Sequence, residues 1–158
     1  TVQIFALLQK YLPKENIIIV IHPKTGALLE NTPLSSNIWR GPISEVLCKA
    51  KLLITDYSSV CYNSFYQGGG VVFYQEDLDY YEKENGKLIP KEDEYIGKRA
   101  FSLEELEEII QNGIKDQTIL LDQFRTKEHE ERYQQINGCS DGKNMERICK
   151  KLEELQLI

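Results

Sequence analysis

Apolar positions along the chain follow two patterns, helical spacing and short unbroken runs. One face of a predicted helix over residues 1–12 carries Val2, Ile4, Phe5, Leu8 and Leu12. Pro13 closes this helix, because proline cannot continue it. Residues 17–21 (IIIVI) are an uninterrupted β-branched run, which is typical of a strand buried on both faces of a parallel sheet.

The rest of the chain continues the alternation of strands and helices. Strands are predicted at 37–40, 52–55 and 71–74, and helices at 42–50, 58–67, 102–113, 118–135 and 143–156. The segment 75–100 is expected to be mostly loop, and Gly68–Gly70 is expected to end a helix and form a turn. This order predicts one α/β domain over residues 1–158, an open, mostly parallel, Rossmann-like sheet with helices on both faces. Residues 118–158 would form its C-terminal helices.

Composition narrows the class of protein. The chain has 158 residues, 41% apolar and 28% charged, which is ordinary for a globular domain. Its net charge of −6 divides into +2 for residues 1–65 and −8 for the remainder. Nucleic acid is therefore excluded as a general partner, because such binding relies on clustered Lys and Arg. No leader or membrane-spanning run is evident, so neither secretion nor a transmembrane helix is predicted.

The four cysteines show no C-x-x-C spacing. Three of them, Cys48, Cys61 and Cys149, fall in predicted helices, where buried free thiols are expected. A zinc site or a disulfide framework is the alternative, and the lack of paired spacing favours a reducing compartment.

Candidate chemistry lies just after the strands, because ligands of open α/β sheets bind at the carboxyl ends of the strands. His22-Pro23 ends the first predicted strand. Proline keeps the preceding residue extended, so His22 is expected at the ligand side of the sheet, where an imidazole could act as acid or base. The alternative is a loop histidine bonded to a nearby carbonyl.

The second buried strand leads directly into Thr55-Asp56-Tyr57-Ser58-Ser59 and a helix. Free backbone N–H groups and two hydroxyls at this point are suited to a phosphate or diphosphate. Helix capping by Asp56 or Ser58 is the alternative, and the two roles are compatible.

The third strand ends near Glu76-Asp77, whose carboxylates could bind ribose or polyol hydroxyls or could simply solubilise a loop. Asp141 is first an N-cap before the last helix. His129, in the charged run KEHEER, is expected to be structural on an exposed helix.

Four segments together resemble a known family. They are the HP pair after a buried strand, LLITDYSSV, VVFYQEDLD and CSDGKNMERI, in this order. The chain is similar, over roughly residues 15–150, to the C-terminal part of the CDP-glycerol:poly(glycerophosphate) glycerophosphotransferases, the teichoic-acid and capsule polymerases of bacteria. ITDYSS is the most specific of these elements.

The resemblance implies the C-terminal half of a GT-B architecture and transfer of glycerol or ribitol phosphate from a CDP-polyol to a lipid-linked acceptor. His22 would match a catalytic histidine of the family. Ser58 and Ser59 would match its phosphate-contacting serines, and Asp141–Lys143 its last helix start. Val20-Ile21, Asn63, Gly69-Gly70 and Asn85-Gly86 replace the basic or acidic residues that the family commonly carries.

The resemblance also implies partners and a location. The donor would be a CDP-activated polyol, the acceptor would bind through an N-terminal domain outside this chain, and the chain would be a fragment inactive by itself. The enzyme would be cytoplasmic and peripheral at the inner face of the bacterial membrane. No cofactor is specified, and a divalent metal is left open.

Two other functions stay open from the residues alone. One is a GT-B glycosyltransferase domain that uses a nucleotide sugar, because the strand-end site would have the same residues. The other is a non-catalytic Rossmann-like interaction domain, in which the serines and Asp56 only cap a helix.

Overall fold

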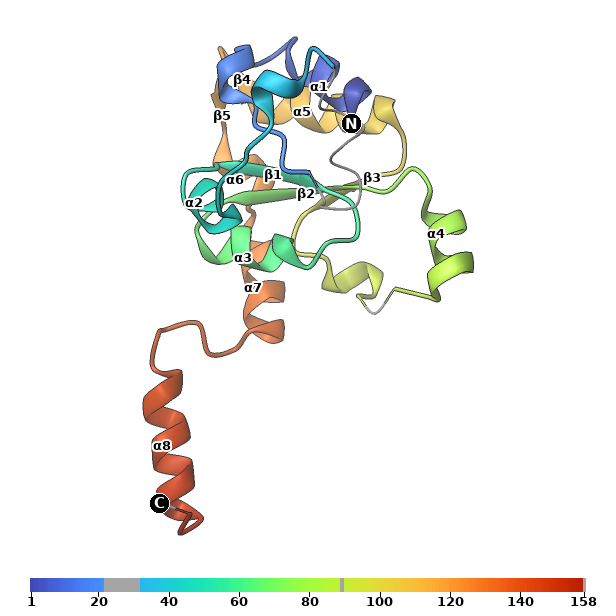
Figure 1. Ribbon diagram of the computed structural model, residues 1–158. Helices are drawn as coiled ribbons and strands as arrows, with labels where there is room; N and C mark the ends of the chain where they lie inside the picture. Colours follow the sequence, from blue (N-terminus) through green and yellow to red (C-terminus); the bar gives the residue numbers. More distant parts are fainter. Residues whose placement is uncertain (22–31, 89, 158) are drawn as a thin grey trace.

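A computed structural model describes residues 1–21, 32–88 and 90–157. Its centre is a parallel sheet of three strands in the order β1-β2-β3 (Figure 1). The strands are β1 (Leu52–Thr55), β2 (Gly70–Tyr74) and β3 (Lys98–Ala100). The parallel sheet with flanking helices confirms the α/β, Rossmann-like fold class.

Side chains of the central strand alternate between two hydrophobic clusters, as the twofold period of a strand requires. Val72 packs in one cluster with residues of α1 (Val2–Leu8) and α5 (Leu103–Gly113). Phe73 packs in the other with residues of α3 (Val60–Tyr66) and α7 (Lys127–Ile136). Helices therefore cover both faces of the sheet, and β2 is buried between them.

Several predicted elements form where their local signals lie. These are α1, α2 (Ile43–Leu47), α3, α5 and α8 (Asn144–Glu154). The Ser102 hydroxyl accepts a hydrogen bond from the Glu105 amide at 3.2 Å, so the predicted cap of α5 is confirmed. Gly68 follows α3 with a φ of 94°, a left-handed conformation that glycine adopts without strain.

The predicted strand at 17–21 is wrong in its pairing and burial. Among the described residues it makes a single parallel bridge, Ile19 with Ile38, and the predicted strand at 37–40 is reduced to that bridge. Ile17 and Ile19 are buried, whereas Ile18 is 48% exposed and Val20 46% exposed. The β-branched run therefore has one apolar face packed against α1 rather than two covered faces.

Segment 75–100 holds more structure than the predicted loop. It forms α4 (Leu78–Asn85), a short 3-10 helix (Glu92–Glu94) and strand β3. The sequence hides β3 because Lys98 and Arg99 interrupt any apolar run. Pairing with β2, not composition, makes this segment a strand.

The single helix predicted at 118–135 is divided. Asp116 and Gln117 have positive φ and turn the chain between β4 (Ile114–Lys115) and β5 (Thr118–Ile119). After α6 (Leu121–Phe124), Thr126 caps α7 by accepting the His129 amide at 3.3 Å. The other short elements of the described ranges are 3-10 helices at Lys14–Asn16 and Ser35–Asn37.

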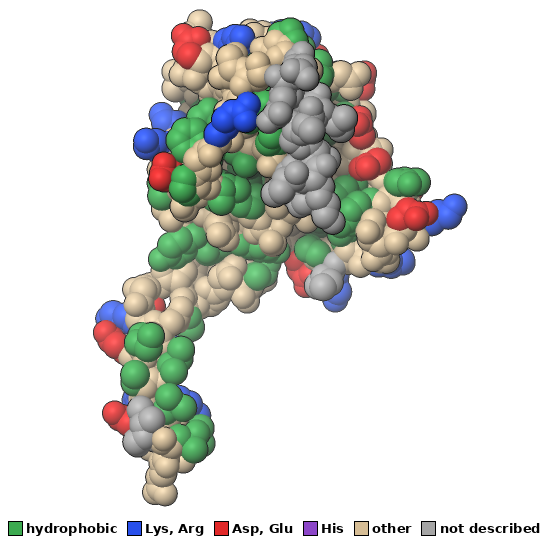
Figure 2. All heavy atoms as spheres, viewed as in Figure 1, with side chains coloured by type: hydrophobic (Ala, Val, Ile, Leu, Met, Phe, Trp, Pro, Cys, Tyr) green, Lys and Arg blue, Asp and Glu red, His purple; other side chains and the backbone are tan. Residues whose placement is uncertain are grey.

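Helix α8 projects away from the rest of the molecule (Figure 1), and Figure 2 shows hydrophobic side chains along it. Met145, Ile148 and Leu155 are exposed. Cys149 on this helix is also exposed, as are Cys48 and Cys139, and only Cys61 is buried. The expectation of buried thiols is therefore correct for Cys61 alone. No helix of the described residues is both long and apolar enough to cross a membrane.

Candidate functional site

The carboxyl ends of β1 and β2 meet at one edge of the sheet. Thr55 is paired with Phe73 in the parallel register, so the loops that follow the two strands start side by side. The Tyr57 hydroxyl donates a hydrogen bond to Asp77 Oδ1 at 2.7 Å. This bond joins two of the segments in which the sequence predicts site residues, Thr55–Ser59 and Asp77.

Tyr57 is fixed from a second side by α4. Its ring stacks on Tyr81, with centroids 3.7 Å apart and planes at 15°. Burial, and then the hydrogen bond to Asp77, raises the pKa of Tyr57, so its hydroxyl stays protonated and keeps donating. Tyr81 is a site residue that sequence reasoning missed, because α4 lies in the segment expected to be loop.

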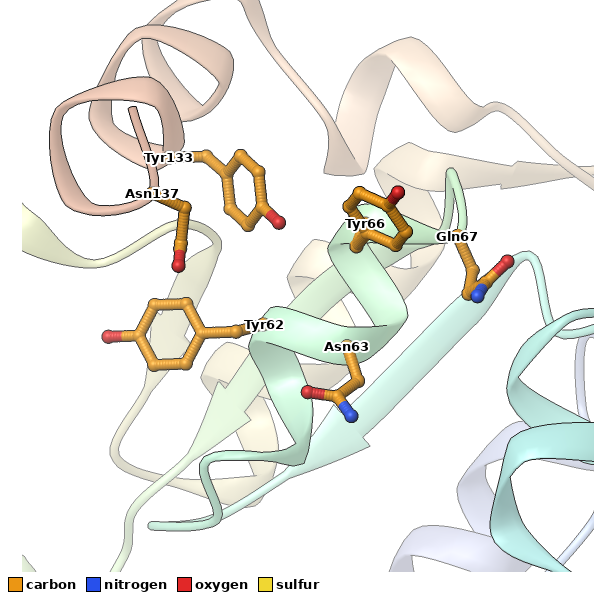
Figure 3. A pocket seen from close by; sticks show the side chains of 6 residues that line it. All are labelled: Tyr62, Asn63, Tyr66, Gln67, Tyr133 and Asn137. Atoms are coloured by element: carbon orange, nitrogen blue, oxygen red, sulfur yellow. The ribbon is translucent and has the colours of Figure 1, made fainter. Parts of the chain in front are cut away.

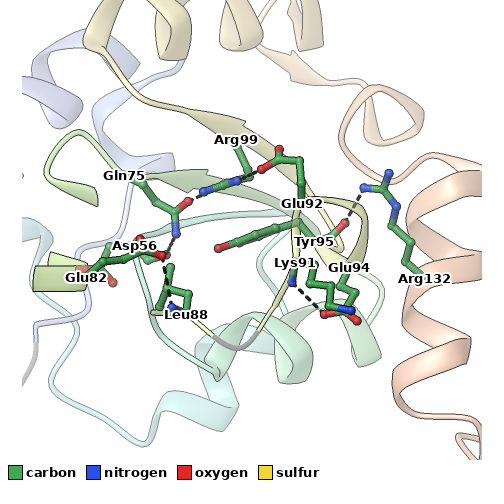
Figure 4. A network of polar contacts seen from close by, with 10 residues as sticks. All are labelled: Asp56, Gln75, Glu82, Leu88, Lys91, Glu92, Glu94, Tyr95, Arg99 and Arg132. Atoms are coloured by element: carbon green, nitrogen blue, oxygen red, sulfur yellow. Dashed lines mark hydrogen bonds and ion pairs between the residues drawn. The ribbon is translucent and has the colours of Figure 1, made fainter. Parts of the chain in front are cut away.

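Asp56 is held by two hydrogen bonds, and Figure 4 shows the one that it makes with Gln75. Its carboxylate accepts the Tyr57 amide at 2.6 Å, and its carbonyl accepts Gln75 Nε2 at 3.3 Å. Gln75 is 1% exposed and receives Arg99 Nε on its Oε1 at 2.8 Å. The Asp56 carboxylate therefore orders the turn after β1, and it does not cap α3.

Arg99 extends this network to the neighbouring 3-10 helix. Its guanidinium pairs with Glu92 and lies 4.0 Å from the centre of the Tyr95 ring. Gln75 and Arg99 were also not predicted as residues of the site. Their only signal in the sequence is that each is a polar residue within or just after a strand. Together they form a polar layer beneath the loop that carries Asp56.

The two serines differ in their hydrogen bonding. Ser58 Oγ accepts the Val60 amide at 3.4 Å, a long contact in the turn before α3, and Ser58 is not the N-cap of this helix. Ser59 is the N-cap of α3, is exposed, and makes no capping hydrogen bond through its side chain. Its hydroxyl is therefore open to a ligand, next to the exposed Ser58.

The carboxylates after β2 are partly engaged within the protein. Asp77 accepts Tyr57, while Glu76 accepts the hydroxyl of Tyr74, whose pKa is raised by burial to about 12. Each carboxylate has a second oxygen, and both side chains are exposed. A ligand hydroxyl could thus share Asp77 with Tyr57.

The structure describes one of the two histidines, His129. His22 lies outside the described residues, so its predicted place at the ligand side stays a prediction. His129 is 6% exposed, so the expectation of an exposed position is wrong. Its Nδ1 accepts the Thr126 amide at 3.3 Å, which gives it the structural role expected.

Asp141 lies apart from this edge, at the start of α8, and is paired with Arg147 at 2.6 Å. It also accepts the Lys143 amide at 3.1 Å, which agrees with the predicted turn before the last helix. The prediction that Asp141 is the N-cap is wrong, because Lys143 holds that position. Within the described ranges, no three His, Cys, Asp or Glu side chains are grouped so that they could hold a metal ion.

Comparison with known proteins identifies the family of the chain. No curated protein matches the chain. The family model described as CDP-Glycerol:Poly(glycerophosphate) glycerophosphotransferase matches residues 3–154, nearly the whole chain. The chain therefore belongs to this family of glycerophosphate-transferring enzymes.

Proposed function

We propose that this domain binds a CDP-polyol donor and takes part in transfer of its polyol phosphate to a lipid-linked acceptor in teichoic-acid or capsule synthesis. The observation that carries the proposal is the meeting of Thr55–Ser59 and Asp77 at one sheet edge in a chain of this family. Carboxyl ends of parallel strands are where such folds bind nucleotides.

Each group at the edge has a role in this proposal. The open hydroxyl of Ser59, that of Ser58 and the neighbouring backbone amides hold the diphosphate. Asp77, fixed by Tyr57, accepts hydroxyl groups of the ribose or the polyol. The Asp56 carboxylate is turned to the Tyr57 amide, from which it accepts a hydrogen bond at 2.6 Å.

The reaction is an in-line displacement at the phosphorus that carries the polyol. The acceptor oxygen forms the new P–O bond, the bond to the CMP oxygen breaks, and CMP leaves with the electron pair. His22 stabilises or protonates the leaving side, and a base outside this chain takes the acceptor proton. Fixed hydrogen bonds around the transferred group supply most of the rate enhancement.

The larger architecture is also part of the proposal. We place this chain as the donor-binding half of a GT-B enzyme, with the acceptor bound by a second half. The enzyme would work at the inner face of the membrane as a peripheral protein, because its acceptor is lipid-linked.

Substitution of His22 tests the catalytic part. In the active enzyme, His22→Ala is expected to lower kcat at least about a hundredfold, as loss of one transition-state donor does. His129→Ala is the matched control: it should lower thermal stability, because His129 is buried, while folded enzyme keeps its turnover. A loss of less than about threefold for His22→Ala contradicts the role.

The donor class is tested separately. Initial rates with CDP-glycerol, CDP-ribitol and UDP-sugars should show turnover with a CDP-polyol only. Turnover with a nucleotide sugar instead would assign the domain to glycosyl transfer.

A further inference from the structure

A hollow lies beside α3, between that helix and the end of α7 (Figure 3). It has a volume of about 260 Å³ and is lined by Tyr62, Asn63, Tyr66, Gln67, Tyr133 and Asn137. An adjoining hollow of about 440 Å³ shares three of these residues and continues along the segment 138–144. The first is a little smaller than the pockets that take drug-sized ligands, so it suits one small unit.

The lining has an unusual chemical character. Among the described residues that line the two hollows, none carries a charge, and the side chains are mainly phenols and carboxamides. Such groups can both donate and accept hydrogen bonds, which matches a ligand rich in hydroxyls. A phosphate would find no cation there, so the chemistry favours an uncharged ligand.

Asn137 places its carboxamide at the wall of this hollow. Its Nδ2 is buried and has no hydrogen-bond partner among the described residues. Figure 3 shows the Asn137 side chain directed into the space between Tyr133 and Tyr62. The Nδ2 is closed to solvent, so a ligand in the hollow meets the carboxamide oxygen, which Figure 3 shows at the tip of the side chain. This oxygen can accept a hydrogen bond from a ligand hydroxyl.

The aromatic walls are held in place before any ligand binds. The Tyr133 ring stacks on Phe65 with centroids 4.9 Å apart. Burial raises the pKa of Tyr133, which keeps its hydroxyl neutral. Tyr66 is 55% exposed and offers a ring face to a ligand at the rim. Aromatic faces with adjacent hydroxyl and amide groups are suited to the apolar face and polar edge of a sugar ring.

The far wall is also ordered by hydrogen bonds. Gln134 Nε2 donates to Ser140 Oγ at 3.3 Å, and Asn144 Nδ2 donates to the Cys139 carbonyl at 2.9 Å. These contacts hold the chain between α7 and α8 beside the hollow. The site is thus pre-formed, which lowers the cost of binding.

We propose that the hollow between α3 and α7 binds a neutral polyhydroxy ligand, a single saccharide ring or an uncharged polyol. Tyr66 and Tyr133 form its walls, and the carboxamide oxygen of Asn137 accepts from a ligand hydroxyl. No residue of Thr55–Ser59 belongs to the described lining of the hollow, whose α3 residues begin at Tyr62. It gives the domain a second place for a hydroxyl-bearing chain, independent of the diphosphate.

The test is a titration of the chain followed by amide NMR, with methyl glucoside and glycerol as uncharged probes and glycerol 3-phosphate as the charged one. At least one uncharged probe should shift amides of Tyr62–Gln67 and Tyr133–Ser140, and the charged probe should shift them less. No shift with either uncharged probe, or an equal response to the phosphate, overturns the proposal.

Variants separate this site from the rest of the surface. Tyr66→Ala and Asn137→Leu should each weaken binding at least about tenfold. Tyr80→Ala is the matched control, because Tyr80 is 68% exposed on α4 and lies outside the hollow, and it should bind as the wild type does. Unchanged binding by Tyr66→Ala, an exposed position that tolerates truncation, overturns the proposal. Nucleotide titration reports on Thr55–Ser59 instead, so failure of either proposal is visible by itself.

Discussion

Two groups of tyrosines border helix α3 and use the same side-chain chemistry differently. Before the helix, Tyr57 donates to Asp77 and stacks on Tyr81. Beside the helix, Tyr66 and Tyr133 line a hollow, and their hydroxyls have no hydrogen-bond partner among the described residues. In the first group the Tyr57 hydroxyl is bonded to the Asp77 carboxylate. In the second group the hydroxyls of Tyr66 and Tyr133 stay available to a ligand.

The difference shows how a loop can be ordered at the edge of a sheet. The loop after β1 is short of apolar side chains, so its position depends on polar contacts: Tyr57 with Asp77, and the Asp56 carbonyl with Gln75. These contacts do not use the hydroxyl of Ser59, which makes no capping hydrogen bond to α3. The tyrosine hollow needs no such contacts, because Phe65 and the core beneath it already fix Tyr133.

The largest effect on stability is expected from removing Gln75, which supports the loop that carries Asp56 and Tyr57. Gln75→Ala removes the buried side chain that bonds Arg99 Nε and the Asp56 carbonyl, leaves these two partly buried groups without a partner, and should lower the free energy of unfolding by about 2 kcal/mol. Urea denaturation measures it. Gln67→Ala, at an exposed position of the hollow, is the matched control and should cost at most about 0.5 kcal/mol. Equal losses for the two variants would show that the loop after β1 depends on polar contacts no more than the hollow does.

A smaller effect is expected from single hydroxyls. Tyr57→Phe keeps the stack on Tyr81 but removes the donor to Asp77, and should cost about 1 kcal/mol of stability. Tyr66→Phe removes a hydroxyl without a partner in the described structure and should leave the melting temperature unchanged. If Tyr66→Phe were the more destabilising, the tyrosines of the hollow would be structural after all.

The smallest expected effect is a dependence of stability on pH that comes from His129, on the helix that also carries Tyr133. Burial, and then repulsion by Arg132, lowers the pKa of His129 below 6.5. The unfolded chain therefore takes up a proton at a higher pH than the folded chain. The stabilisation is complete above pH about 6.5 and is lost as the pH falls through the lowered pKa.

Unfolding measured across this window checks the sign. The free energy of unfolding should decline on acidification in the wild type, and it should decline less in His129→Gln. A steeper decline in His129→Gln would contradict the assignment of His129 as a buried, neutral acceptor of the Thr126 amide.

Prediction from the sequence succeeded where local signals were strong. The apolar runs of β1 and β2, the Ser102 cap and Gly68 specify their elements without help from the rest of the chain. It failed for β3 and α4, whose polar residues are organised by pairing with β2 and by contacts such as that of Tyr81 with Tyr57.

The meeting of these segments at one sheet edge was predictable, but the contacts between them were not, and their role as a ligand site stays a prediction. The rule that ligands bind at carboxyl ends of strands located Thr55–Ser59 and Asp77. No sequence pattern links Tyr57 to Asp77, twenty residues later, or shows that Gln75 supports the loop from beneath. These contacts arise only when neighbouring strands come together.

The central claim is that the edge formed by Thr55–Ser59 and Asp77 holds the diphosphate of a CDP-polyol. Titration of the isotope-labelled chain with CDP-glycerol, followed by amide NMR, tests it most directly. The account predicts saturable shifts at Asp56–Ser59 and Asp77, weakened in Ser59→Ala. Saturable shifts confined to other parts of the chain, or no shifts at all, would contradict it.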